Sequence, residues 1–407
     1  MRIIHTADWH LGQFFYTKSR AAEHQAFLDW LLAQVTEQQA DAIIVAGDIF
    51  DTGSPPSYAR ELLNRFIVRL QPTGCQLVLL GGNHDSVAVL NESRHLLACL
   101  NTTVVAAAAE QPDQQILRLN NRHGQPAALL CAIPFLRPRD ITTSQAGLSG
   151  LEKQQSLLEA ITTHYQRCWQ HALQQREEMK LSVPVIATGH LTTVGVTQSD
   201  SVRDIYIGTL DAFPAQAFPP ADYIALGHIH RAQRIAGTEH IRYSGSPIPL
   251  SFDELGKEKS VFLVEFAGDK LHRVEPLVIP MFQPMQIIKG SLEEITRQLT
   301  AIQPRPDGKV VWLDIEVVTD CWLNDLQRRI QEITHDLPVD IVLLRRSREQ
   351  REQTIVRQDN ETLSELSVED VFARRLASEQ DMSPQRLARI TALFQQTLAE
   401  IDEEEQP

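Results

Sequence analysis

Short apolar runs alternate with longer amphipathic segments in the first part of the chain. The apolar runs predict buried strands over residues 2–6, 42–46 and 77–80. Helices are predicted over residues 19–38, from Pro55 to about Leu70, and from about Val87 to Leu100. The first helix carries its apolar residues on one face: Ala22, Phe27, Leu28, Leu31, Leu32 and Val35. This order of strands and helices is typical of an α/β sheet.

The middle of the chain predicts a second group of strands. They are expected over residues 104–108, 116–119, 127–133, 183–187 and 223–226, with a long helix over 151–180. Residues 240–246 and a hairpin over 260–279 are expected to complete a second sheet. The loop 191–220 has little pattern of its own, and a loop of that length indicates function or mobility.

The pattern changes near Pro280–Pro284, where we place a domain boundary. A small β-α-β-α-β unit is predicted beyond it, with elements over 285–289, 291–303, 309–318, 322–335 and 339–345. The expected domains are 1–280, a small α/β capping domain at 281–345, a polar linker at 346–366 and a helical arm at 367–407. The arm has an apolar face of Leu387, Ile390, Leu393, Phe394 and Leu398, which suits either a partner protein or its own domain.

Polar side chains follow five of the apolar runs, each at the point where the strand ends. These are Asp8 and His10, Asp48 and Asp51, Asn83, His84 and Asp85, then His190, and finally His228 and His230. Any one of these groups alone could be a hydrogen-bonded loop. Five together, at the strand ends where α/β sheets place their sites, indicate a functional centre.

The residue types indicate which chemistry this centre performs. Carboxylate, imidazole and amide ligands without thiolate suit Mn²⁺, iron or Zn²⁺, and they argue against calcium or a structural zinc. Seven of these residues fit two metals with four protein ligands each if one carboxylate bridges. A two-metal centre activates water and neutralises an attacked phosphoryl group.

Composition and charge narrow the class of protein. The 407 residues are 43% hydrophobic and 22% charged, as in a globular protein of two or three domains. No run of about 18 apolar residues occurs, and the N-terminus lacks the apolar core of a signal peptide, so we expect a cytoplasmic protein without a membrane span. The net charge of −14 does not favour DNA binding by this chain alone. The five scattered cysteines are expected to be buried free thiols.

The series D-x-H, G-D-x-x-D, G-N-H-D, G-H and G-H-x-H resembles the signature of the calcineurin-like metallophosphoesterase family. The resemblance implies a double β-sheet sandwich flanked by helices. It also implies one metal held by Asp8, His10, Asp48 and His230, and a second held by Asp48, Asn83, His190 and His228. His84 would orient the phosphate and protonate the leaving oxygen, and Asp51 would orient His84. Asp85 receives no role.

Residues 5–12, His-Thr-Ala-Asp-Trp-His-Leu-Gly, together with the small domain and the helical tail, resemble bacterial DNA repair nuclease subunits within that family. The resemblance implies Mn²⁺-dependent, ATP-regulated 3′→5′ exonuclease action on double-stranded DNA ends and endonuclease action on hairpin DNA. It also implies a homodimer within a heterotetramer, with the arm docked on a coiled-coil ABC-type ATPase. That partner would supply part of the DNA-binding surface and explain the acidic charge.

Two other functions fit the same residues. A phosphomonoesterase or small-molecule phosphodiesterase could use the same fold, and a scaffold with a decayed site would lack ligands, of which none is missing. Four basic residues are candidates for phosphate contacts, although solvated charges explain them more simply: Lys18, Arg20, Arg137 and Arg139. By resemblance, the dimer surface would use the helices after Asp51 and Asp85, with candidate residues Leu62, Phe66, Leu90 and Leu97.

Overall fold

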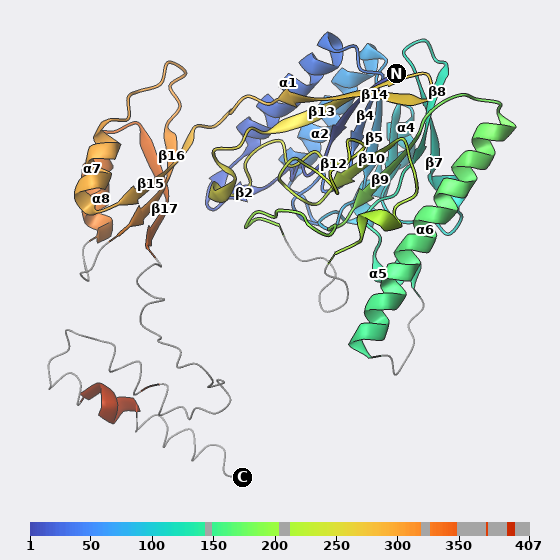
Figure 1. Cartoon of the computed structure of the whole chain (residues 1–407). Coiled ribbons are helices and arrows are strands. Elements are labelled where there is room, and N and C mark those ends of the chain that lie inside the picture. The colour runs from blue at the N-terminus through green and yellow to red at the C-terminus, as the bar shows by residue number, and fades with distance from the viewer. Residues whose placement is uncertain (143–148, 203–211, 319–325, 348–371, 373–388, 395–407) are drawn as a thin grey trace. The chain divides into compact units, whose positions relative to one another are not determined.

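The structure is a computed structural model of the whole chain (Figure 1), and it describes residues 1–142, 149–202, 212–318, 326–347, 372 and 389–394. The chain divides into two compact units. The first comprises residues 1–287, 302–314 and 334–343, and the second comprises residues 288–301, 315–333 and 344–407.

The first large sheet has the strand order β14-β13-β1-β4-β5-β6. Its strands are β1 (Arg2–Thr6), β4 (Ala42–Val45), β5 (Gln76–Leu80), β6 (Thr102–Val105), β13 (Ser260–Ala267) and β14 (Lys270–Val278). β1, β4, β5 and β6 are parallel, whereas β13 pairs with β1 antiparallel, with Ile3 opposite Val264. The prediction that the 260–279 hairpin belongs to the second sheet is therefore wrong. The apolar run of β1 needs a neighbour on both edges to satisfy its backbone, and β13 provides the second one.

The second large sheet has the order β11-β12-β10-β9-β8-β7. Its strands are β7 (Ile116–Asn120), β8 (Pro126–Cys131), β9 (Val185–His190), β10 (Tyr223–Gly227), β11 (Gln233–Arg234) and β12 (Ile241–Tyr243). β8, β9, β10 and β12 are parallel, and β7 and β11 lie antiparallel at the edges. A separate two-stranded ribbon joins β2 (Phe14–Phe15) to β3 (Lys18–Ser19).

The two large sheets pack face to face, and side chains alternate between their two surfaces. In β4, Ala42 and Ile44 join a buried layer with Leu130 and Ile186 of the second sheet, while Ile43 and Val45 face the helices. The helices α1 (Ala21–Glu37) and α2 (Ser57–Leu70) cover the outer surface of the first sheet, and α6 (Gly150–Glu178) covers the second (Figure 1). This confirms the predicted double β-sheet sandwich flanked by helices.

Some helices differ from their predicted form. The predicted helix 87–100 is two short helices, α3 (Val87–Glu92) and α4 (Arg94–Ala98), separated at Ser93. Asn91 and Ser93 compete for backbone hydrogen bonds, which weakens a continuous helix. A short helix α5 (Pro138–Ile141) precedes α6.

The four candidate dimer residues are buried within this one chain. Leu62 and Phe66 of α2, and Leu90 and Leu97 of α3 and α4, all belong to the core beneath the first sheet. They are not available to a second copy, so a dimer surface on these helices would use exposed neighbours such as Val68 and Leu96.

The region after Pro284 forms a three-stranded sheet of order β15-β16-β17. Its elements follow the predicted order: β15 (Met285–Gly290), α7 (Leu292–Thr300), β16 (Val311–Val317), α8 (Leu326–Thr334) and β17 (Val339–Arg346). The proposed linker 346–366 lies outside the described residues beyond position 347, and the proposed arm 367–407 lies outside them except for Phe372 and residues 389–394.

Two predictions from the sequence concern membrane-spanning helices and the state of the cysteines. Among the described residues, no helix has both the length and the apolar character needed to cross a membrane. Cys75, Cys131 and Cys168 are buried free thiols as expected, but Cys99 is exposed at the end of α4. Consecutive residues point to all sides of a short surface helix, and only Leu97 of this apolar run is buried, so the expectation of burial is wrong for Cys99. Cys321 lies outside the described residues.

Candidate metal centre

The polar residues predicted from the sequence follow strands at one end of the two sheets. β1, β4 and β5 are parallel in the first sheet, and β9 and β10 are parallel in the second, so their carboxyl ends form two facing edges. Hydrogen bonds join these edges. The His228 N–H donates to Asp8 Oδ1 at 2.9 Å, and His190 Nδ1 bonds the carbonyl of Ala46 at 2.8 Å. The sandwich therefore brings groups more than a hundred positions apart into one centre.

The segment after β1 turns two polar side chains into the centre while anchoring the residue between them. Asp8 and His10 adopt left-handed backbone conformations, with φ of 55° and 46°. Trp9 is fully buried, and its ring packs edge-on against Phe27 and Phe66 at 5.7 Å between ring centroids. Left-handed conformations cost about 1–3 kcal/mol each for such residues, and they cluster at functional sites. The burial of Trp9 offsets this cost.

Asp48 and His228 repeat the same backbone feature on two other strands. Their φ angles are 50° and 92°, again in the left-handed region. Glycine is required at two positions in the loops around Asp48, because a Cβ atom would have no room there. A Cβ on Gly47 would collide with the His190 ring, and one on Gly82 would collide with the Asp48 carboxylate. The glycines of the G-D and G-N-H-D motifs therefore allow the loops to close around Asp48.

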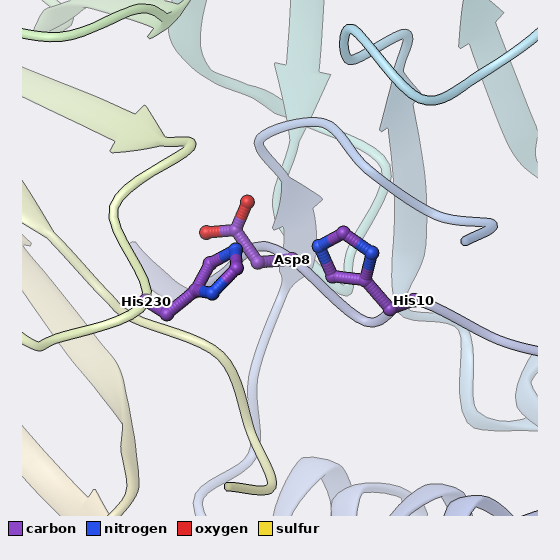
Figure 2. A group of neighbouring side chains, drawn as sticks. All are labelled: Asp8, His10 and His230. Carbon is purple, nitrogen blue, oxygen red and sulfur yellow. The ribbon is translucent and has the colours of Figure 1, made fainter. Parts of the chain in front are cut away.

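Three overlapping groups of side chains have ligand atoms close enough to share a metal ion. They are Asp8, His10 and His230; His10, Asp48 and His84; and Asp48, His190 and His228, with ligand atoms within 4.8 Å of one another in each group. Figure 2 shows the first group, in which Asp8 and His10 come from the segment after β1 and His230 from the segment after β10. His10 and Asp48 each belong to two of these groups, but of the two only Asp48 is grouped with His190 and His228, which is the position of a bridging ligand.

Asp48 has the densest set of contacts in the centre. Its Oδ1 accepts the backbone N–H of His84 at 2.9 Å, and its Oδ2 lies 3.2 Å from His190 Nε2 and 3.7 Å from His10 Nε2. Burial raises the pKa of Asp48, but the surrounding histidines, His190 first, outweigh it and hold that pKa well below its usual range. The carboxylate is therefore ionised and ready to bind a cation.

Asn83 connects the two histidines of the second predicted ligand set. Its Oδ1 lies 2.9 Å from His190 Nε2 and 3.2 Å from His228 Nδ1. Burial lowers the pKa of His190, but the Asp48 and Asp8 carboxylates raise it more, to about 9. His190 would have to release a proton before its Nε2 could bind a divalent cation.

The donor set fits divalent metal ions. Among the described residues, three buried atoms of the centre lack a hydrogen-bond partner: Asp8 Oδ2, His10 Nε2 and His228 Nε2. Buried polar atoms are normally paired because an unpaired one costs about 1–3 kcal/mol. Unpaired carboxylate and imidazole atoms from two separate loops are what a metal centre presents to its ions.

The predicted catalytic pair, His84 and Asp51, lies beside the ligands. His84 Nδ1 is 2.7 Å from the backbone carbonyl of Asp51, and the Asp51 carboxylate is 3.1 Å from His10 Nδ1. The His84 ring lies edge-on to His10, with 4.7 Å between centroids. Asp51 thus contacts His84 through its main chain and His10 through its side chain. The catalytic roles of both residues stay predictions.

Asp85, which had no predicted role, braces the two loops around Asp48. Its carboxylate accepts the backbone N–H groups of Ile49 at 3.1 Å, Phe50 at 2.9 Å and Gly82 at 2.9 Å. Burial and the nearby Asp48 carboxylate raise the pKa of Asp85 to about 6, against the lowering effect of the three N–H groups. The side chain holds the G-D-x-x-D loop against the G-N-H-D loop.

Replacing Asp85 with alanine is expected to lower the free energy of unfolding by about 3–5 kcal/mol, because three buried N–H groups lose their acceptor. Asp85→Asn keeps one acceptor oxygen and is expected to lose less. Urea unfolding followed by circular dichroism measures both changes. An unfolding free energy unchanged in Asp85→Ala would show that the loops do not depend on this carboxylate.

The basic residues considered as phosphate contacts have different surroundings. Arg20 is fully buried and paired with Glu23, so it is neither a phosphate contact nor a solvated charge. Arg137 donates from Nη2 to the Asp85 carbonyl at 3.0 Å, whereas Arg139 is exposed and Lys18 half-buried.

The residues that the sequence did not single out are Ser201, Glu254 and Lys259, which surround His230. They lie outside the strands, in segments that only the folded chain brings together.

Comparisons with known proteins agree with this geometry. Residues 1–232 match the family described as calcineurin-like phosphoesterase, and residues 281–380 match the family described as type 5 capsule protein repressor C-terminal domain. The first match spans every predicted ligand.

Similar proteins extend over nearly the whole chain. The SbcD component of the nuclease SbcCD from Escherichia coli strain K12 is 64% identical over 399 residues, which covers 98% of this chain and 98% of that protein. The protein of the same name in Rhodobacter capsulatus is 34% identical and covers 83% of this chain and 88% of its own, and that in Bacillus subtilis strain 168 is 29% identical, covering 81% and 82%. The chain therefore belongs to the calcineurin-like phosphoesterases, as a phosphodiester hydrolase of the SbcD nuclease family.

Proposed function

We propose that this protein is a two-metal, Mn²⁺-dependent DNA nuclease that degrades double-stranded ends in the 3′→5′ direction and opens hairpins. The observation that carries the proposal is the position of Asp48, whose carboxylate lies beside His10 of one ligand set and shares a group of ligand atoms with His190 and His228 of the other. Seven ligands are assigned to the metals: Asp8, His10, Asp48, Asn83, His190, His228 and His230. Mixed oxygen and nitrogen donors without thiolate suit Mn²⁺, iron or Zn²⁺, and Mn²⁺ is proposed among them because the chain resembles the bacterial DNA repair nuclease subunits.

In this proposal the bound cations supply Lewis acidity to the phosphoryl group and acidify water. The protein's own groups position the substrate and move the proton. A backbone carbonyl can only accept, so the contact with Asp51 places a hydrogen on His84 Nδ1. His84 Nε2 is then the atom that donates a proton to the departing 3′-oxygen. Asp51 orients His84 through its carbonyl and His10 through its carboxylate.

Cleavage of end-labelled hairpin DNA by this chain, with Mn²⁺ and then with Mg²⁺, tests the proposal. A mononucleotide ester assayed in parallel separates it from the alternative function, a phosphomonoesterase or small-molecule phosphodiesterase. Cleavage of the hairpin with Mn²⁺ supports the nuclease. Turnover of the ester with an intact hairpin would favour the alternative.

We further propose that the protein acts as a homodimer within a heterotetramer, with an SbcC-type coiled-coil ABC ATPase that regulates cleavage through ATP. The curated relatives carry the name of a two-component nuclease, SbcCD. A chain with a net charge of −14 also needs a partner to attract DNA strongly. The proposed location is the cytoplasm, at the nucleoid when the complex is on DNA.

Removing residues 367–407 is expected to abolish binding of the ATPase while leaving Mn²⁺-dependent hydrolysis of a simple phosphodiester unchanged. The reason is that the apolar face of the segment, which includes Ile390 and Leu393, suits a groove on another protein. Co-purification of the two proteins measures the first effect. Recovery of the ATPase with the truncated chain would place the docking surface elsewhere.

A further inference from the structure

His230, a candidate metal ligand, is surrounded by a buried network of polar side chains. Its Nδ1 lies 2.6 Å from the Ser201 hydroxyl, and the carboxylate of Glu254 lies just behind, with Oε1 at 3.5 Å. His230 and Glu254 are almost fully buried. The ring of His230 therefore has one nitrogen facing a defined polar partner rather than solvent.

In the described part of the chain, the hydrogen-bond partners of the Glu254 carboxylate are donors. Its Oε1 accepts the hydroxyls of Ser199 at 2.9 Å and Ser201 at 2.6 Å, and its Oε2 accepts the Leu250 N–H at 3.1 Å and pairs with the Lys259 ammonium. A carboxylate with this surrounding set is ionised and acts as an acceptor only. Ser201 also lies 3.1 Å from the Ser199 hydroxyl, but the charged carboxylate at 2.6 Å is the stronger acceptor, so the hydroxyl hydrogen of Ser201 is directed at Glu254.

This direction decides which nitrogen of His230 carries a hydrogen. Ser201 has one hydroxyl hydrogen, and once it points to Glu254 the oxygen offers only lone pairs to His230. Nδ1 must then be the protonated nitrogen. Nε2 then keeps its lone pair, and a neutral imidazole binds a metal through such an unprotonated nitrogen.

Lys259 holds the main chain of the same residue. Its buried ammonium donates to the His230 carbonyl at 3.0 Å and to the Ser246 hydroxyl at 2.8 Å, besides pairing with Glu254. The Ser246 N–H also donates to the His230 carbonyl, at 3.1 Å. Both the ring and the backbone of His230 are thus fixed from one network.

We propose that Ser201, Glu254 and Lys259 are positioning residues for His230, and that Glu254 sets the Ser201 hydroxyl as the acceptor that keeps His230 Nε2 available to a metal. This inference rests on the proposed two-metal centre. It assigns a role to the first part of the long loop after β9, which supplies Ser201, and predicts that the network acts on the metal shared with Asp8 and His10.

The test is a titration of the purified full-length protein with Mn²⁺ by isothermal calorimetry, with metal content by mass spectrometry. Ser201→Ala is expected to weaken one of the two Mn²⁺ equivalents by about 10–100-fold, the usual effect of losing a partner of a ligating histidine. The second equivalent is expected to stay unchanged. Ser201→Thr, which keeps a hydroxyl, is expected to restore the affinity.

Ser199→Ala is the matched control, because Ser199 bonds the same Glu254 oxygen and lies 3.1 Å from the Ser201 hydroxyl, whereas only Ser201 of the two bonds His230. It is expected to bind two equivalents like the unmodified protein. Two tight equivalents in Ser201→Ala would overturn the inference, as would equal losses in Ser199→Ala and Ser201→Ala. Failure of the unmodified protein to bind two Mn²⁺ would instead overturn the proposed metal centre, so the two failures are distinguishable.

Discussion

His84→Gln is expected to keep both metal ions and to lose DNA cleavage by at least about 100-fold, the usual contribution of a general acid. Glutamine can still donate a hydrogen bond, but its amide cannot donate a proton to a departing oxygen. His84 touches the ligands through its backbone N–H, which donates to Asp48, and through its ring, which lies beside His10. Metal content measured alongside cleavage of hairpin DNA separates the two effects.

A matched control is His123→Gln, which changes an exposed histidine in the turn between β7 and β8. It is expected to cleave like the unmodified protein. Cleavage retained in His84→Gln would remove the proton-donor role from this residue. Loss of metal together with cleavage would show that His84 is itself a ligand. This outcome is a distinct alternative, because His84 shares a group of ligand atoms with His10 and Asp48.

Asp48→Asn is expected to weaken the binding of both Mn²⁺ ions by at least about 100-fold and to abolish cleavage. Loss of an outer partner of a ligand costs about 10–100-fold, so loss of charge from a shared ligand reaches at least the upper end of that range. The Asp48 carboxylate lies between histidines of both ligand groups, at 3.2 Å from His190 and 3.7 Å from His10. Calorimetric titration with Mn²⁺ measures the number of sites and their affinities.

The control for this substitution is Asp269→Asn in the exposed turn between β13 and β14, which also removes one negative charge. Binding there is expected to match the unmodified protein. If Asp48→Asn lost one equivalent and kept the other at full affinity, Asp48 would belong to a single ion and the bridging assignment would be wrong.

The strands that present the centre could be predicted because their sequence pattern is strong and local. Residues 42–46 and 77–80 are uninterrupted apolar runs, and each is followed at once by glycine and then by polar residues. A parallel strand buried on both faces has this pattern, and its carboxyl end is where a site forms. The positions of Asp8, Asp48 and Asn83 in the structure follow from that rule.

Features that depend on pairing between distant segments could not be predicted in the same way. The hairpin 260–279 reads as two strands, but whether it joins β1 or another strand depends on which edge stays open after the remaining strands have paired. Likewise, Leu62 and Phe66 fit either a dimer surface or a core, since an apolar helix face looks the same in both cases.

By itself the sequence determined the class of fold, the five strand-end motifs and the types of ligand, because strand periodicity and ligand chemistry are properties of neighbouring residues. Only the tertiary structure decided which oxygen or nitrogen atom meets which partner. The Asp85 carboxylate connects two loops by accepting hydrogen bonds from both. Ser201 bonds the ring of His230 and the carboxylate of Glu254. A buried hydrogen bond depends on atoms a few ångströms apart in space, and residues from separate loops reach that distance only once both sheets have packed.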